Sequence, residues 1–91
     1  MNAAMRTPSG VRMIELGELW GAFSPLSGQT VLLNTEAVAI LEVLREQPGD
    51  LARVCQTLAM DTDLDARELM QRCAPAWQQL LDAGLLEAAA A

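Results

Sequence analysis

Short runs of hydrophobic residues alternate with polar ones over the first third of the chain, and hydrophobic residues recur at helical spacing over the remainder. The runs 11–16, 19–24 and 29–33 have the composition of strands, and turn signals separate them at 17–18 (Gly-Glu) and 25–28 (Pro-Leu-Ser-Gly). This pattern predicts a three-stranded antiparallel meander. The outer edges of its first and third strands stay unpaired unless another segment covers them.

Three amphipathic helices are predicted after the strands. Asn34 is a favourable N-cap for a first helix over residues 35–46, which must stop before Pro48 and Gly49. Asp50 is a similar cap for a second helix that reaches about residue 60. Together with the strands, these helices predict an α+β fold, a three-stranded antiparallel β-meander followed by three α-helices.

The predicted third helix, over residues 64–83, has an unusually wide apolar surface. Asp65 and Glu68 have the spacing of a capping box at its start, and Gly84 suits the position after its end. The helix is either central, with the sheet on one side and helices on the other, or it lines a groove for a partner. Its two neighbouring apolar stripes span about 160°, against about 100° for an ordinary surface helix, and consist of Leu69, Cys73, Ala76 and Leu80, and of Met70, Ala74, Trp77 and Leu81.

Pro75 interrupts the same helical pattern. Proline has no N–H to donate to the carbonyl of Gln71, and its ring clashes with that turn. The sequence therefore predicts a kink or a split near residue 74, without deciding between the two.

The length of 91 residues leaves room for one domain with one core. We expect a flexible lead-in over 1–10, the domain over 11–87 and a tail over 88–91. The longest apolar run in mid-chain, 37–41, is far shorter than the ~20 residues of a membrane span. The first ten residues contain no stretch typical of a signal peptide, so the sequence predicts a cytoplasmic protein without a membrane partner.

The charge and the side-chain inventory exclude several classes of function. A net charge of −6, with a pI near 4.3, argues against binding of nucleic acids. The chain has no His, Lys or Tyr to act as a general base or to activate Ser9, Ser24 or Ser27, so we expect no enzymatic activity.

Metal ions and cofactors are not expected either. The acidic run 61–65 is similar to the start of a calcium loop, but Ala66 and Arg72 stand where such a loop needs Gly and Glu. Cys55 and Cys73 are too far apart for a metal-binding motif, and each lies on an apolar helical stripe. Buried, reduced thiols are the favoured interpretation, with a redox or metal role as the alternative.

Two stretches resemble the PqqD-like peptide chaperones, which are also called RiPP recognition elements. They are G-Q-T-V-L-L-N-T-E-A-V-A-I-L-E-V-L over 28–44 and L-L-D-A-G-L-L over 80–86. The resemblance covers about residues 11–87 and implies a winged-helix-like domain. Such a domain binds the leader segment of a ribosomally made precursor peptide and presents it to a modifying enzyme, without catalysis of its own, in natural-product biosynthesis.

The stretch 19–25 is similar to a subgroup encoded beside kinase-like proteins related to the HPr kinases. The resemblance also implies where the leader lies, namely as an added strand along the third strand and against the third helix. Arg72 could pair with an acidic leader residue or could simply be solvated. The implied strand residues are Gln29, Thr30, Val31, Leu32 and Leu33, and the implied helix residues are Leu69, Arg72, Cys73, Ala76 and Gln79.

Other functions are compatible with the same order of elements. A winged-helix DNA-binding regulator is the main alternative, but the third helix offers only Arg67 and Arg72 beside three acidic residues. A structural subunit that completes a larger enzyme shares most of the expected features. A homodimer formed by strand exchange is also left open.

Overall fold

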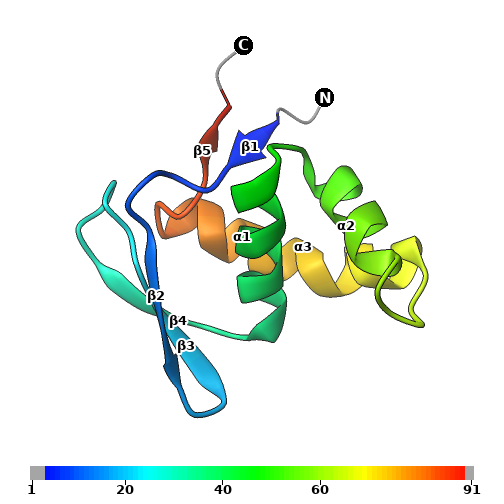
Figure 1. Cartoon of the computed structure of the whole chain (residues 1–91), viewed down its shortest axis with the longest axis horizontal. Helices are drawn as coiled ribbons and strands as arrows, with labels where there is room; N and C mark the ends of the chain where they lie inside the picture. The colour runs from blue at the N-terminus through cyan, green and yellow to red at the C-terminus, as the bar shows by residue number, and fades with distance from the viewer. Residues whose placement is uncertain (1–3, 90–91) are drawn as a thin grey trace.

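The computed structural model describes residues 4–89, and Figure 1 shows a small sheet beside a group of three helices. The order of the elements confirms the predicted α+β fold. Two short strands near the chain ends were not predicted. The elements are β1 (Met5–Arg6), β2 (Arg12–Leu16), β3 (Leu19–Phe23), β4 (Thr30–Leu33), α1 (Thr35–Glu46), α2 (Leu51–Ala59), α3 (Ala66–Asp82) and β5 (Glu87–Ala88).

The main sheet is an antiparallel meander in the order β2-β3-β4, as predicted. Its register pairs Gly21, at the centre of β3, with Ile14 of β2 and Leu32 of β4. Side chains alternate between the two faces of a strand. Ala22 and Leu33 therefore point toward the helices and are fully buried, whereas Ile14 and Leu32 point away and are exposed.

The ends of the helices follow the capping pattern of the sequence. Asn34, Asp50 and Asp65 are the N-caps, and each side chain accepts a hydrogen bond from the backbone N–H three residues later, at 2.9, 2.9 and 2.8 Å. Gly84 follows α3 with a φ of 74°, a left-handed conformation that glycine adopts without strain. Within residues 4–89, the helices are too short or too polar to cross a bilayer.

Helix α3 does not split at Pro75. It runs without a break from Ala66 to Asp82 and includes the proline. Pro75 and Gln71 both lie on the exposed side of the helix, so water can hydrate the Gln71 carbonyl that has no proline N–H to bond to.

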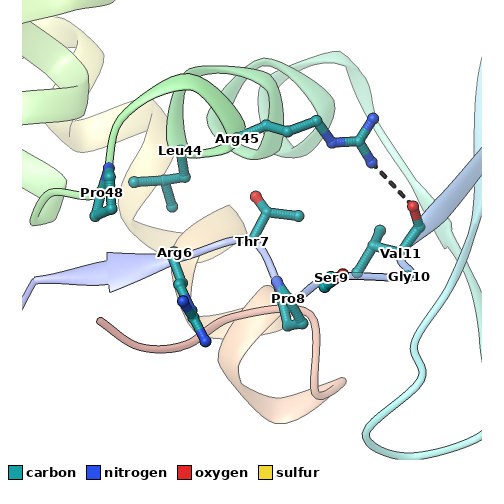
Figure 2. A pocket seen from close by; sticks show the side chains of 9 residues that line it. All are labelled: Arg6, Thr7, Pro8, Ser9, Gly10, Val11, Leu44, Arg45 and Pro48. Carbon is teal, nitrogen blue, oxygen red and sulfur yellow. Dashed lines mark hydrogen bonds between the residues drawn. The ribbon is translucent and has the colours of Figure 1, made fainter. Parts of the chain in front are cut away.

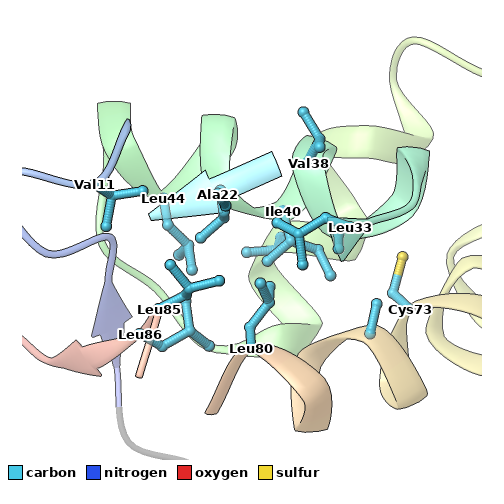
Figure 3. Packing of buried hydrophobic residues seen from close by; sticks show 14 of the residues in the cluster. Val11, Ala22, Leu33, Val38, Ile40, Leu44, Cys73, Leu80, Leu85 and Leu86 are labelled. Carbon is cyan, nitrogen blue, oxygen red and sulfur yellow. The ribbon is translucent and has the colours of Figure 1, made fainter. Parts of the chain in front are cut away.

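The central helix is α1 rather than α3. It contacts α2 and α3 on one side and β3 and β4 on the other, whereas α3 packs mainly on α1 and α2. The expectation that α3 lies between the sheet and the other helices is therefore wrong. Only one of its two apolar stripes is buried, and Figure 3 shows Cys73 and Leu80 of that stripe beside the core residues of α1 and the sheet. The second stripe is half-buried or exposed.

The two ends of the chain are tied to each other and to α1. Strands β1 and β5 are antiparallel, with Arg6 opposite Glu87 and an ion pair of 3.4 Å between their side chains. The Thr7 hydroxyl donates to the Leu41 carbonyl at 2.8 Å. The expected lead-in and tail thus contain paired strands within 4–89, while positions 1–3 and 90–91 lie outside the described residues.

Two buried thiols face each other across the α2–α3 contact. Cys55 and Cys73 are both buried and form no disulfide. Burial, reinforced by the neighbouring Cys73, raises the pKa of Cys55 from 9.0 to about 11, and burial also raises the pKa of Cys73.

The stability of the fold should fall at alkaline pH because of these thiols. Above pH 9 the thiols of the unfolded chain lose protons while the folded ones keep theirs, so ionisation favours unfolding until the pH passes about 11. The chain has no His, Lys or Tyr, so few other side chains titrate in this window. We predict that urea unfolding, followed by Trp fluorescence, gives a decreasing free energy of unfolding between pH 9 and 11.

The double variant Cys55→Ala, Cys73→Ala is the control for this prediction. Its free energy of unfolding should stay nearly constant over the same pH range. An equal decrease in the variant would show that the thiols are not the cause.

Candidate functional site

Strand β4 has a free edge that points away from β3. The backbone N–H of Ser24 donates to the Gln29 carbonyl at 2.9 Å, so these two residues form a hydrogen-bonded pair. Hydrogen-bonded and non-hydrogen-bonded pairs alternate along antiparallel strands. The register therefore turns the N–H and C=O groups of Thr30 and Leu32 outward. No other strand within residues 4–89 pairs with this edge.

An open groove of about 610 Å³ runs between this edge and the C-terminal half of α3. The side-chain amide of Gln79 reaches across it, and its Nε2 donates to the outward Leu32 carbonyl at 3.2 Å. The adjacent Gln78 amide instead donates to the Asp82 carboxylate, one turn along α3, at 3.0 Å. The lining residues are Gln29, Val31, Pro75, Gln78, Gln79, Asp82 and Ala83.

The turn between β3 and β4 is fastened to the end of α3. The buried Ser24 hydroxyl donates to the Gly84 carbonyl at 2.6 Å and accepts from the Ser27 N–H at 3.1 Å. The Ser27 hydroxyl donates to the Ala83 carbonyl at 3.2 Å. These bonds, called the serine clasp below, fix the distance between β4 and α3 at one end of the groove.

The serine clasp also explains why glycine occupies position 84. The backbone there has a positive φ, and a Cβ would lie 2.9 Å from the Ser24 Oγ. A larger residue would therefore be strained and would disturb the hydrogen bond that closes the groove.

Of the five predicted strand residues, four form β4, and Gln29 directly precedes it. Gln29 and Val31 line the groove, and Thr30 and Leu32 direct their backbone groups toward it. Leu33 is fully buried and pairs with Trp20 of β3.

Among the predicted helix residues, only Gln79 lines the groove. Leu69, Cys73 and Ala76 are buried because their stripe of α3 packs on α1 and α2, so they do not form the groove wall. Arg72 is exposed and lies seven residues before Gln79, on the same side of the helix.

The groove wall lies next to the buried stripe of α3, about a third of a turn around the helix. Its residues Pro75, Gln78 and Asp82 have the i, i+3, i+7 spacing of one helix face and were not predicted to contact a ligand. Pro75 is the sequence feature that could have indicated this face of the helix. A proline in mid-helix is tolerated best on an exposed side, which would have placed this face outside the core.

A second cavity, of about 510 Å³, lies between the N-terminal segment and α1. It contains Arg6 and Arg45, but Figure 2 shows that their guanidinium groups point in different directions. Arg45 donates to the Val11 carbonyl at 3.0 Å, and Arg6 pairs with Glu87. The two arginines therefore do not converge on a common anion. The described residues also contain no group of three His, Cys, Asp or Glu placed to hold a metal ion.

Comparison with solved structures shows that the sheet and three helices share the fold of a PqqD RiPP recognition element. No protein-family model and no curated protein matches the sequence. One similar structure is TbiB1 in complex with the TbiA(beta) leader peptide. Its TM-score is 0.67 at 14% identity, and the alignment covers 94% of this chain and 99% of that one.

A second similar structure is the PqqD truncation of Methylobacterium extorquens PqqCD, described as a functional, stand-alone RiPP recognition element. Its TM-score is also 0.67, at 24% identity, and the alignment covers 92% of this chain and 88% of that one. At these identities the likeness concerns the fold.

Removal of the serine clasp should destabilise the domain. Ser24→Ala removes the buried hydroxyl that bonds to the Gly84 carbonyl and to the Ser27 N–H. Both groups lose this partner, so we predict that the free energy of unfolding falls by about 1–3 kcal/mol. Ser27→Ala, whose hydroxyl bond is exposed, is the matched control and should cost less. Equal small losses in urea unfolding would show that the buried bond does not hold the turn to α3.

Proposed function

We propose that this chain binds the leader segment of a ribosomally synthesised precursor peptide as an added strand on β4. The observation that carries the proposal is the free edge of β4, where Thr30 and Leu32 turn their N–H and C=O groups toward the groove. An extended peptide can satisfy these groups by strand addition. The fold supports the proposal, since one similar structure contains a leader peptide.

The groove itself indicates which side chains a leader would meet. Its wall is polar, with Gln78 and Gln79, and its one charged lining residue is Asp82. A basic or hydroxyl-bearing leader residue suits the Asp82 end. An acidic residue suits the Arg72 end, because Arg72 lies on the same side of α3 two turns earlier.

The chain would act as a non-catalytic chaperone in the cytoplasm and would present the leader to a modifying enzyme encoded nearby. The residues 19–25 favour the subgroup encoded beside kinase-like proteins, so a kinase-like protein is our candidate partner. A DNA-binding regulator is not favoured, because the net charge of −6 opposes contact with phosphates.

The pairing of β4 predicts different effects of proline at two adjacent positions. Proline at 30 should weaken leader binding, and proline at 31 should destabilise the sheet. Thr30→Pro removes an outward donor that β3 does not use, so it should weaken leader binding at least about tenfold with little effect on folding. Val31→Pro is the control, since its N–H belongs to a hydrogen-bonded pair with Ala22 and its loss should destabilise the sheet.

NMR titration of the labelled chain with leader segments of precursors encoded near its gene provides the measurement. The wild type should show shifts in the amides of residues 29–33 and 75–83. Absence of shifts with every such leader, or unchanged binding by Thr30→Pro, would contradict strand addition on β4.

Gln79 should act as a competitor of the leader. Its amide occupies the Leu32 carbonyl that an added strand would use, so a bound leader must displace it. We predict that Gln79→Ala binds the leader about two- to fivefold more tightly, the value of one exposed hydrogen bond. Gln78→Ala is the control, because Gln78 bonds within α3. Weaker binding by Gln79→Ala would show instead that Gln79 contacts the leader directly.

A further inference from the structure

The end of the groove beside the C-terminus of α3 holds a carboxylate without a cation. Asp82 is exposed, and it is the one charged residue that lines the groove. Within residues 4–89 the single ion pair joins Arg6 to Glu87, so Asp82 takes part in none. The Gln78 amide donates to Asp82 Oδ1 at 3.0 Å. The carboxylate is therefore oriented by its own helix, and its second oxygen is available to a ligand in the groove.

The position of Asp82 on α3 adds to this negative charge. It is the last residue of the helix, and the last turn contains no basic residue. The C-terminal end of a helix carries a partial negative charge, so a cation is favourable there and a carboxylate is unfavourable. Arg72 lies ten residues earlier, which is about 15 Å along the helix axis. Salt at about 0.1 M screens charges beyond ~10 Å, so Arg72 does not neutralise the Asp82 end.

Helix α3 and strand β4 pass each other in opposite directions, and this determines where an added strand meets Asp82. The Gln79 amide donates to the Leu32 carbonyl, and the Ala83 carbonyl accepts from the Ser27 hydroxyl. The C-terminus of α3 therefore lies beside the start of β4. Asp82 is located between these two contacts on the helix, so it faces the same end of the strand.

A strand added to β4 would turn alternate side chains toward α3. Residues side by side on neighbouring strands point to the same face of a sheet. Gln29 and Val31 direct their side chains into the groove, so the peptide residues beside these two positions do the same. The residue beside Gln29 then faces Asp82. The residue beside Val31, two positions along the peptide, meets a side chain that packs on the core, so an apolar residue is favourable there.

We propose that the groove selects leaders with Lys or Arg at the position that faces Asp82, two positions away from an apolar residue beside Val31. This inference rests on the proposed function, since it concerns the same groove. The cation bonds to the second oxygen of Asp82 and lies at the negative end of α3. A hydroxyl-bearing residue could form the hydrogen bond but would bring no charge to that end.

Selection from a displayed library of random peptides of about ten residues, long enough for one strand, tests the proposal on the full chain. The wild type should enrich peptides with Lys or Arg at one fixed position, two residues from an apolar one. Asp82→Asn should enrich peptides without this basic preference. Asp63→Asn removes the same charge from the exposed turn before α3, so it is the matched control and should retain the preference.

Thr30→Pro separates this proposal from the proposed function. It should lose the enriched peptides, because it removes an outward backbone donor of β4. Peptides that depend on Thr30 but carry no fixed basic residue, or an unchanged basic preference in Asp82→Asn, would overturn selection by Asp82 and leave strand addition intact. A wild type that enriches no peptide, or peptides that bind Thr30→Pro equally well, would overturn both.

Fluorescence anisotropy with one enriched, labelled peptide gives the size of the effect. Replacement of its Lys or Arg by Met should weaken binding to the wild type about three- to tenfold at low salt. The same replacement should change binding to Asp82→Asn by less than about twofold. Asp82→Asn should unfold at no lower temperature than the wild type, because Asn can still accept the Gln78 bond. An equal loss of peptide affinity in both proteins would overturn the proposal.

Discussion

The structure depends on one constraint: the edge strand β4 is held at a fixed distance from α3. Within the described residues, no other strand pairs with the outward backbone groups of β4. The serine clasp sets this distance at one end, through the 2.6 Å bond from Ser24 to the Gly84 carbonyl. At the other end, β4 leads directly into α1, which is capped by Asn34 and packs against α3. Without these two attachments the edge would remain, but it would lack the helix wall beside it.

An unpaired strand edge is normally a hazard, since it can pair with any extended chain. This chain limits the hazard in two ways. The edge strand is only four residues long, and Gln79 occupies its Leu32 carbonyl.

Much of the fold could be predicted from local sequence signals. Turn residues and N-caps act over three or four positions, so the meander, the three helices and Gly84 were all predicted. Contacts between distant segments leave no such local signal. The pairing of β1 with β5 joins residues more than eighty positions apart, and nothing in the two-residue runs Met5–Arg6 and Glu87–Ala88 indicates it.

The candidate site shows the same division. The open edge of β4 was predicted, since it follows from the order of the strands. On the helix, Leu69, Cys73 and Ala76 are buried rather than lining the groove, because their stripe of α3 packs on α1 and α2. Gln79 does line the groove. A stripe of hydrophobic residues indicates that this side of a helix is buried, but it does not indicate which element packs against it. The glutamines that line the groove carry no pattern that distinguishes them from an ordinary solvated face.

Amide hydrogen exchange at single-residue resolution tests the central claim most directly. In the free chain the amides of Thr30 and Leu32 should exchange rapidly, while those of Val31 and Leu33, which pair with β3, should be protected. A bound leader should protect Thr30 and Leu32 and leave the other two unchanged. Protection of Thr30 and Leu32 in the free monomer, or their continued rapid exchange with a leader bound, would contradict the account.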